Sequence, residues 1–157
     1  MVQRFQSFWV VAIAGFVLIV GTVSGYLRFS DMRESVARGA ALYAASPGSE
    51  LQGRMTGHAE ALPALATRCS NCHLQPGADT SKLGPDKRFG PVLTAEHLLQ
   101  AKARRGGPPT VFDEASFCRV LREGLDPAMV IIDQTMPRYS ATPAQCTDLW
   151  NYLSASH

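Results

Sequence analysis

Two cysteines and a histidine form the closest group of chemically reactive side chains in this sequence. They lie in RCSNCH at residues 68–73, where Cys69 and Cys72 are three positions apart and His73 follows directly. Residues i, i+3 and i+4 of a helix share one face, so the three side chains are expected to point the same way. We therefore expect them to hold one bound group together.

Three chemistries use the pattern C-x-x-C. A thioredoxin-like redox pair requires a scaffold of strands and helices, and no strand alternation of useful length occurs in this chain. A four-cysteine zinc site could be built with Cys118 and Cys146, but these two are not closely spaced and His73 would have no role. The third chemistry is covalent haem attachment at C-x-x-C-H, in which Cys69 and Cys72 form thioethers to the porphyrin and His73 binds the iron. The presence of His73 favours haem.

The chain resembles the class I, single-haem cytochromes c across nearly all of residues 31–157. The resemblance rests on RCSNCH, on TMPRY at 135–139 and on DLWNYL at 148–153, in that order. It implies an all-α fold, with helices around one covalently bound haem c and with the first and last helices crossing. It also implies that the protein accepts and passes one electron at a time.

The resemblance assigns the second axial ligand of the iron to Met136, which is followed by Pro137 as in the distal loop of the family. A thioether opposite an imidazole is the ligation that electron-carrying cytochromes use. A bis-histidine site with His58 or His97 is one alternative. A core methionine at position 136, without a ligand role, is another.

Two further residues are expected at the haem by the same resemblance. A proline carbonyl would accept a hydrogen bond from the second ring nitrogen of His73, which fixes the tautomer of the ligand. The segment FGPVL makes Pro91 the candidate, and GPD at residues 84–86 is its competitor. Tyr139 is expected near the haem edge or the helix crossing, or else as a core aromatic residue.

The remaining cysteines, Cys118 and Cys146, are expected to form a disulfide. Haem is attached to such proteins outside the cytoplasm, where thiols tend to oxidise. The bridge would close a loop that contains Met136 and stabilise the fold by about 3.5 kcal/mol through lost loop entropy. We expect it to hold the distal loop so that Met136 stays on the iron, whereas two buried free thiols are the alternative.

The elements expected to position these residues are helices separated by loops rich in glycine and proline. Cap and stop residues and apolar periodicity place the helices as follows: one that starts at Asp31 and continues through Tyr43, one over Leu62 to His73, a brief one over Thr94 to Arg104, one from a cap at Asp113 to a stop at Gly124, and one that begins at Thr142 and Pro143. Loops are expected over residues 46–60 and 74–93.

The first thirty residues differ from the rest. The apolar stretch from Phe8 to Leu27 has 20 residues, or about 30 Å as a helix, which matches a bilayer core. A secretory signal peptide has an apolar region of only about 7–15 residues. We therefore expect a retained transmembrane helix over residues 1–30 and a cytochrome c domain over residues 31–157, with a cleaved signal peptide as the alternative.

Charge and anchoring limit the function. The net charge is +2, and after residue 30 the 13 acids are balanced by the cations, so the basic excess of a nucleic-acid binder is missing. The sequence predicts an electron carrier, not an enzyme. We expect a single-pass protein of the inner membrane with its haem domain in the periplasm. Its partners would be redox proteins in or at that membrane, and it would act alone or as the cytochrome subunit of a respiratory or dehydrogenase complex.

Two other functions stay open at this point. A haem-based sensor of small ligands, or a peroxidase, would use the same haem but would release Met136 from the iron. A structural domain held together by zinc would use the four cysteines.

Overall fold

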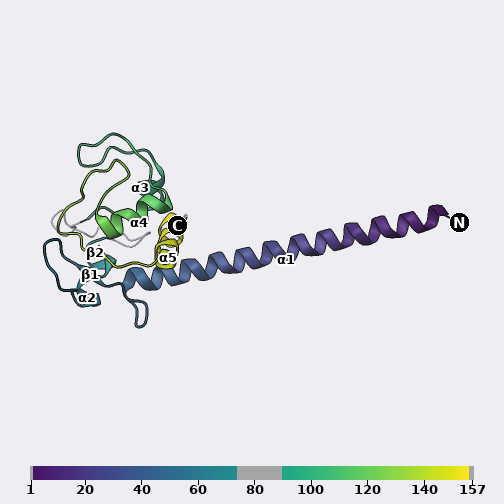
Figure 1. The fold of residues 1–157 in the computed structure, drawn as a ribbon, viewed down its shortest axis with the longest axis horizontal. Coiled ribbons are helices and arrows are strands. Elements are labelled where there is room, and N and C mark those ends of the chain that lie inside the picture. The colour runs from purple at the N-terminus through teal and green to yellow at the C-terminus, as the bar shows by residue number, and fades with distance from the viewer. Residues whose placement is uncertain (1, 74–89, 156–157) are drawn as a thin grey trace, which may run out of the picture. The chain divides into compact units, whose positions relative to one another are not determined.

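A computed structural model describes residues 2–73 and 90–155, with the backbone alone for residues 2–20 and 23. This part of the chain is mostly helical, which confirms the predicted predominance of helix (Figure 1). Its elements are α1 (Val2–Ala44), β1 (Gly53–Arg54), α2 (Ala64–Thr67), the 3-10 turn η1 (Cys69–Asn71), α3 (Ala95–Leu99), α4 (Glu114–Glu123), β2 (Arg138–Tyr139) and α5 (Pro143–Ser154).

The chain divides into two compact units, Met1–Glu34 and Ser35–His157. Among the residues that the structure describes, no helix is both long and apolar enough to cross a membrane. Most side chains of the predicted membrane segment, Phe8 to Leu27, lie outside the described residues. The predicted loop over residues 74–93 also lies largely outside them.

The predicted helix start at Asp31 is wrong, because α1 continues through this position from Val2 to Ala44. The hydroxyl of Ser30 donates a hydrogen bond to the carbonyl of Leu27 at 2.8 Å, so it bonds back along the helix and caps no new one. No proline interrupts the segment. The helix ends where Ala45 adopts a left-handed conformation with φ of 50°.

The last turns of α1 pack against α5 at Gly39. A Cβ atom at this position would lie 2.0 Å from the carbonyl oxygen of Asp148 and 2.7 Å from Cβ of Tyr152. Only glycine permits such an approach of two helix backbones. Within the second unit, the first and last helices therefore meet at this glycine.

Asp148 fastens the same contact. Its buried carboxylate accepts hydrogen bonds from the hydroxyl of Ser35 at 2.6 Å and from the guanidinium of Arg38 at 2.9 and 3.0 Å. Burial alone would raise the pKa of Asp148, but these hydrogen bonds outweigh it and hold the pKa below its usual range. Asn151 of α5 also donates to the Ser35 hydroxyl, at 2.9 Å.

Helix α4 begins and ends where the sequence predicts, α5 begins where it predicts, and the two helices lie beside each other (Figure 1). Asp113 and Ser116 form a capping box at the start of α4, and Thr142 and Gln145 form another at the start of α5. Gly124 ends α4 in a left-handed conformation with φ of 75°. These signals were read correctly because they act within one turn of the chain.

The helix predicted over Leu62 to His73 is shorter than expected. Arg68 is extended, with ψ of 140°, and it separates α2 from η1. The backbone N–H groups of Cys72 and His73 nevertheless both donate to the carbonyl of Cys69, at 3.2 and 2.9 Å. A tight turn, and not a longer helix, therefore holds Cys69, Cys72 and His73 close together.

The brief helix predicted over Thr94 to Arg104 also ends early. Helix α3 starts at Ala95, after a cap at Thr94, but it stops at Leu99. Lys102 and Thr110 then exchange backbone hydrogen bonds at 3.2 and 3.1 Å, so the chain doubles back instead of continuing a helix.

The polar segment predicted as a loop over residues 46–60 contains a short strand. Gly53 pairs with Tyr139 and Arg54 with Arg138 in an antiparallel ladder. A Cβ at Gly53 would lie 2.8 Å from Cβ of Thr67, so the strand also packs closely against α2. The ladder ties this segment to the chain just after Met136.

The buried side chains of the second unit form one hydrophobic cluster. It draws on the end of α1, on α3, α4 and α5 and on the segments between them: Leu42, Tyr43, Leu51, Leu98, Phe112, Phe117, Val120, Leu121, Tyr139, Ala141, Cys146, Leu149 and Leu153. Met136 and Trp150 pack against it from partly buried positions. The cluster forms the apolar walls of the cavity described below.

Replacing Gly39 with alanine tests the contact between α1 and α5. The new methyl group would meet a backbone carbonyl that cannot move independently of α5, so we expect a loss of about 2–3 kcal/mol in the free energy of unfolding. Gly25→Ala is the matched control on the same helix, because a Cβ there has nothing within 4 Å. Denaturant unfolding of the full chain measures both, and equal stability of the two variants would contradict the packing described.

Candidate functional site

One cavity of about 390 Å³ brings together the residues that the sequence singles out. Its volume falls in the range of roughly 300–1,000 Å³ that cofactor and small-molecule sites occupy. All six predicted haem-site residues line it: Cys69, Cys72, His73, Pro91, Met136 and Tyr139. Most of the remaining wall is apolar, with Phe112, Phe117, Val120, Leu121, Leu149 and Leu153 among its residues.

His73 is buried and held from three sides. Its Nδ1 lies 2.8 Å from the carbonyl oxygen of Pro91. Its backbone carbonyl accepts a hydrogen bond from the hydroxyl of Tyr43 at 2.8 Å, and its backbone N–H donates to the carbonyl of Cys69. Because a carbonyl only accepts, Nδ1 carries the proton and Nε2 keeps its lone pair for a ligand.

The charge state of His73 suits this role. Burial lowers the pKa of His73, and the hydrogen bond to Pro91 opposes the shift only in part. The imidazole is therefore neutral at pH 7, which is the form that binds metals. The contact with Pro91 is the one that the sequence analysis expected, whereas its competitor at residues 84–86 lies outside the described residues.

Gly90 lets the chain approach the imidazole of His73. A Cβ at Gly90 would lie 2.3 Å from Cε1 and 2.6 Å from Nδ1 of the ring. The N–H of Gly90 donates to the carbonyl of Cys72 at 3.2 Å, which fixes this approach. The Pro91 carbonyl can reach Nδ1 because residue 90 has no side chain.

Cys69 and Cys72 are free thiols at intermediate burial. Burial raises the pKa of the Cys69 thiol to about 12, so it is protonated at neutral pH. A thioredoxin-like pair needs the opposite, a thiol whose pKa is lowered. The two remaining cysteines are joined to each other, which leaves only two thiols for a zinc site. Among residues 2–73 and 90–155, no group of three or more His, Cys, Asp or Glu side chains is arranged to hold a metal ion by itself.

Met136 lies in a segment with a fixed backbone. Its N–H donates to the carbonyl of Asp133 at 3.2 Å, and its own carbonyl accepts a hydrogen bond from Arg138 at 2.6 Å. The side chain reaches the cavity from the edge of the hydrophobic cluster. Of the two histidines considered as alternative ligands, His97 lines the cavity, whereas His58 is exposed and does not.

Tyr139 links the strand after Met136 to the turn that carries the cysteines. Its ring is buried, and its hydroxyl donates a hydrogen bond to the carbonyl of Thr67 at 2.5 Å. Burial raises the pKa of Tyr139, so the hydroxyl keeps its proton. Tyr139 therefore holds α2 in place next to Cys69 in addition to lining the cavity.

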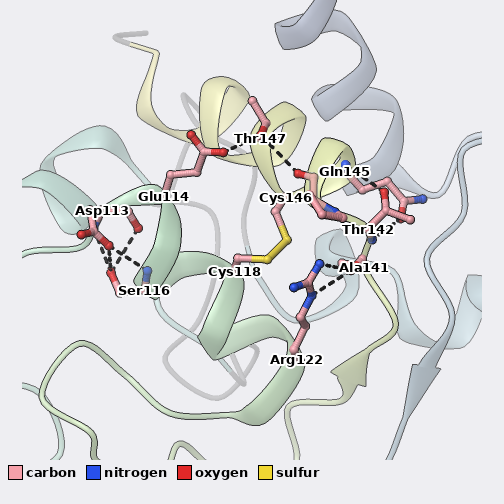
Figure 2. Close-up of a disulfide and its surroundings, with 11 residues drawn as sticks. Asp113, Glu114, Ser116, Cys118, Arg122, Ala141, Thr142, Gln145, Cys146 and Thr147 are labelled. Carbon is pink, nitrogen blue, oxygen red and sulfur yellow. Dashed lines mark hydrogen bonds between the residues drawn. A yellow bond between two sulfur atoms is a disulfide. The ribbon is translucent and has the colours of Figure 1, made fainter.

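The disulfide between Cys118 and Cys146 joins α4 to α5, with Cα atoms 5.4 Å apart (Figure 2). Arg122 of α4 supports the same junction, because its guanidinium donates to the carbonyl of Ala141 at 2.8 and 2.6 Å. Glu114 and Thr147 add a hydrogen bond between the two helices (Figure 2). The segment that carries Met136 thus starts and ends on helices that are fastened to each other.

The sequence placed Arg104 only at the end of a brief helix, but it is a cavity residue. Arginines in a loop of glycine and proline are usually solvated, but Arg104 lines the cavity and its guanidinium donates to the carbonyls of His97, Lys102 and Thr110. It also lies over the ring of Phe112, 4.7 Å from the centroid. Burial lowers its pKa. These partners are set by the doubling back of the chain after α3, which no local pattern indicates.

Sequence reasoning also did not find Tyr43 and Met55 as cavity residues. Tyr43 was predicted only as part of a helix, and Met55 only as part of a polar loop, yet both line the cavity.

Comparisons of the chain with protein-family models, with curated proteins and with solved structures found no match. The function of the site has to be inferred from its own residues.

Removing the disulfide by the double substitution Cys118→Ser and Cys146→Ser should destabilise the protein. The crosslink spans a sequence separation of 28, and the loss expected from loop entropy is about 3.5 kcal/mol in the free energy of unfolding. Denaturant unfolding under non-reducing conditions measures it. Reduction of the unsubstituted protein is the control and should produce a similar loss. A midpoint that neither treatment moves would contradict the role given to the bridge.

Proposed function

We propose that this protein is a single-haem c-type cytochrome that passes one electron at a time between protein partners. One observation carries the proposal: two free thiols, an imidazole whose Nδ1 is already bound and a thioether all line the same apolar cavity. This combination matches the covalent, axially ligated haem of such proteins. The resemblance in the motifs RCSNCH and TMPRY supports it.

The residues present fit a haem. A porphyrin supplies four of the ligands of its iron, so the protein has to supply only two. His73 would bind through Nε2, since Nδ1 is engaged by Pro91. Met136 would bind through its sulfur from the segment between α4 and α5. Cys69 and Cys72 would form the thioether bonds, in which the S–H of each thiol adds across a C=C bond of a porphyrin side chain, so that sulfur joins one carbon and hydrogen the other.

When bound, the haem iron alternates between two oxidation states and so carries one electron. The chain's own residues set how readily it does so. The hydrogen bond from His73 to Pro91 makes the imidazole a stronger donor, and the apolar walls keep water away from the centre. With His73 and Met136 as its two protein ligands, the iron would have no position left for a substrate, so the proposed role is that of a carrier and not of an enzyme.

We further propose that residues 1–30 anchor the protein in the inner membrane and that the haem domain lies in the periplasm. The apolar stretch from Phe8 to Leu27 supports the anchor. The disulfide between Cys118 and Cys146 supports an oxidising compartment. Its partners would be redox proteins in or at that membrane, with which it acts alone or as the cytochrome subunit of a respiratory or dehydrogenase complex.

The test is to mature the chain in a host that attaches haem covalently and to record its absorption spectrum. We expect haem that survives extraction with acidified acetone and, in the oxidised protein, the weak far-red band of sulfur-to-iron ligation. The double variant Cys69→Ala and Cys72→Ala should lose its haem completely on extraction. The Cys118→Ser and Cys146→Ser variant is the matched control and should retain it.

The outcomes separate the candidate functions. Extractable haem, or no haem, in the unsubstituted protein would overturn the proposal. Covalent haem with high-spin iron and no far-red band would overturn the carrier and support the sensor or peroxidase, in which Met136 is displaced.

Gly90→Ala tests the support of His73. The added methyl group would collide with the imidazole, so we expect the haem-loaded protein to lose about 1–3 kcal/mol of stability and to change its midpoint potential. Pro91→Ala is the control, because it keeps the backbone carbonyl and should cost no more than about 1 kcal/mol. Denaturant unfolding and a redox titration measure the two effects. A Gly90→Ala protein that matches the control would contradict the close packing.

A further inference from the structure

Met55 faces the same cavity as Met136. It lies at intermediate burial in the segment that sequence reasoning treated as a polar loop. The ladder that pairs Arg54 with Arg138 brings the segment of Met55 beside the segment that follows Met136. Met55 follows Arg54 directly, and Met136 precedes Arg138 by two residues. The next position of the ladder would set Met55 opposite Pro137.

The segment that carries Met55 is held in place. The N–H of Leu62 donates to the carbonyl of Gly53 at 2.9 Å, which closes a turn over residues 53–62. The N–H of Ser140 donates to the carbonyl of Gln52 at 3.0 Å, and Gly53 is packed against Thr67. The backbone that leads to Met55 is therefore held against β2 and α2.

Two of the methionines with described side chains line the cavity, and two do not. Among the described residues, Met136 is one of those that pack against the hydrophobic cluster, and Met55 is not. Met32 and Met129 are 52% and 58% exposed and do not line the cavity. Met55 and Met136 are thus the two methionines with described side chains that line the cavity.

We propose that Met55 is a second thioether ligand of the haem iron, which binds the iron when Met136 does not. The inference rests on the proposed function. In the exchange, one iron–sulfur coordinate bond breaks and another forms, and neither an electron nor a proton is transferred. The iron keeps the same type of donor, so the protein stays a six-coordinate carrier when the Met136 segment moves.

His97 is the competing donor, because it also lines the cavity. Burial is the main cause that lowers its pKa, so its imidazole is neutral and able to bind a metal. Met55 is preferred to His97 because the β1–β2 ladder sets its segment beside the one that carries Met136.

The experiment compares three haem-loaded variants by absorption spectroscopy. Met136→Leu should retain a far-red sulfur-to-iron band and low-spin iron. Met136→Leu with Met55→Leu should lose the band completely and become high-spin. Met136→Leu with Met129→Leu is the matched control, because Met129 is exposed outside the cavity, and it should match Met136→Leu alone.

The inference is overturned if Met136→Leu has no sulfur-to-iron band. High-spin iron would then indicate water, and low-spin iron without the band would indicate a nitrogen donor such as His97. Haem that survives acidified acetone in all variants, together with the band in the unsubstituted protein, shows that the proposed function holds even where the inference fails.

A second measurement avoids any variant at position 136. Added imidazole should displace Met136 from the iron and then compete with Met55 for the open position. We expect Met55→Leu to bind imidazole several-fold more tightly than the unsubstituted protein and than Met129→Leu. Equal dissociation constants for the three proteins would overturn the inference.

Discussion

The hydrogen bond between His73 and Pro91 is the interaction on which the rest of the site depends. It fixes the proton on Nδ1 and leaves Nε2 as the ligand atom. It forms only because Gly90 has no side chain beside the ring and because Tyr43 and Cys69 hold the backbone of His73. Residues of α1, of η1 and of the segment that starts at Gly90 thus hold His73 in one tautomer.

The helices around this bond are joined by polar contacts as well as by apolar packing. Burying the carboxylate of Asp148 costs desolvation free energy, and the hydrogen bonds from Ser35 and Arg38 offset it, as the lowered pKa indicates. The carboxylate lies beside Gly39, where α1 and α5 approach most closely. On the other side of α5, the disulfide and Arg122 fix α4. The cavity keeps its walls because α5 is fastened to both neighbours.

Local signals account for what the sequence predicted well. The caps at Asp113 and Thr142 act on their own helix turns, and the C-x-x-C-H spacing is contained in one turn, so each could be read without knowing the fold. The predictions that failed concern features that depend on contacts between residues far apart in the sequence. Arg68 is extended although its neighbours suit a helix, and a strand of two residues at Gly53 is too short for any alternation to show. The inward position of Arg104 depends on carbonyls brought close by tertiary contacts.

The two cavity thioethers are held by different parts of the chain. Met136 lies inside the loop that the disulfide closes, between α4 and α5. Met55 lies before the cysteine motif and outside that loop, and its segment is fixed through Gly53, Thr67 and β2. Opening of the disulfide would therefore free the segment of Met136, whereas the contact of Gly53 with Thr67, next to Met55, would remain. Because β2 pairs with the strand that precedes Met55 and begins two residues after Met136, its register sets how the two segments lie beside each other.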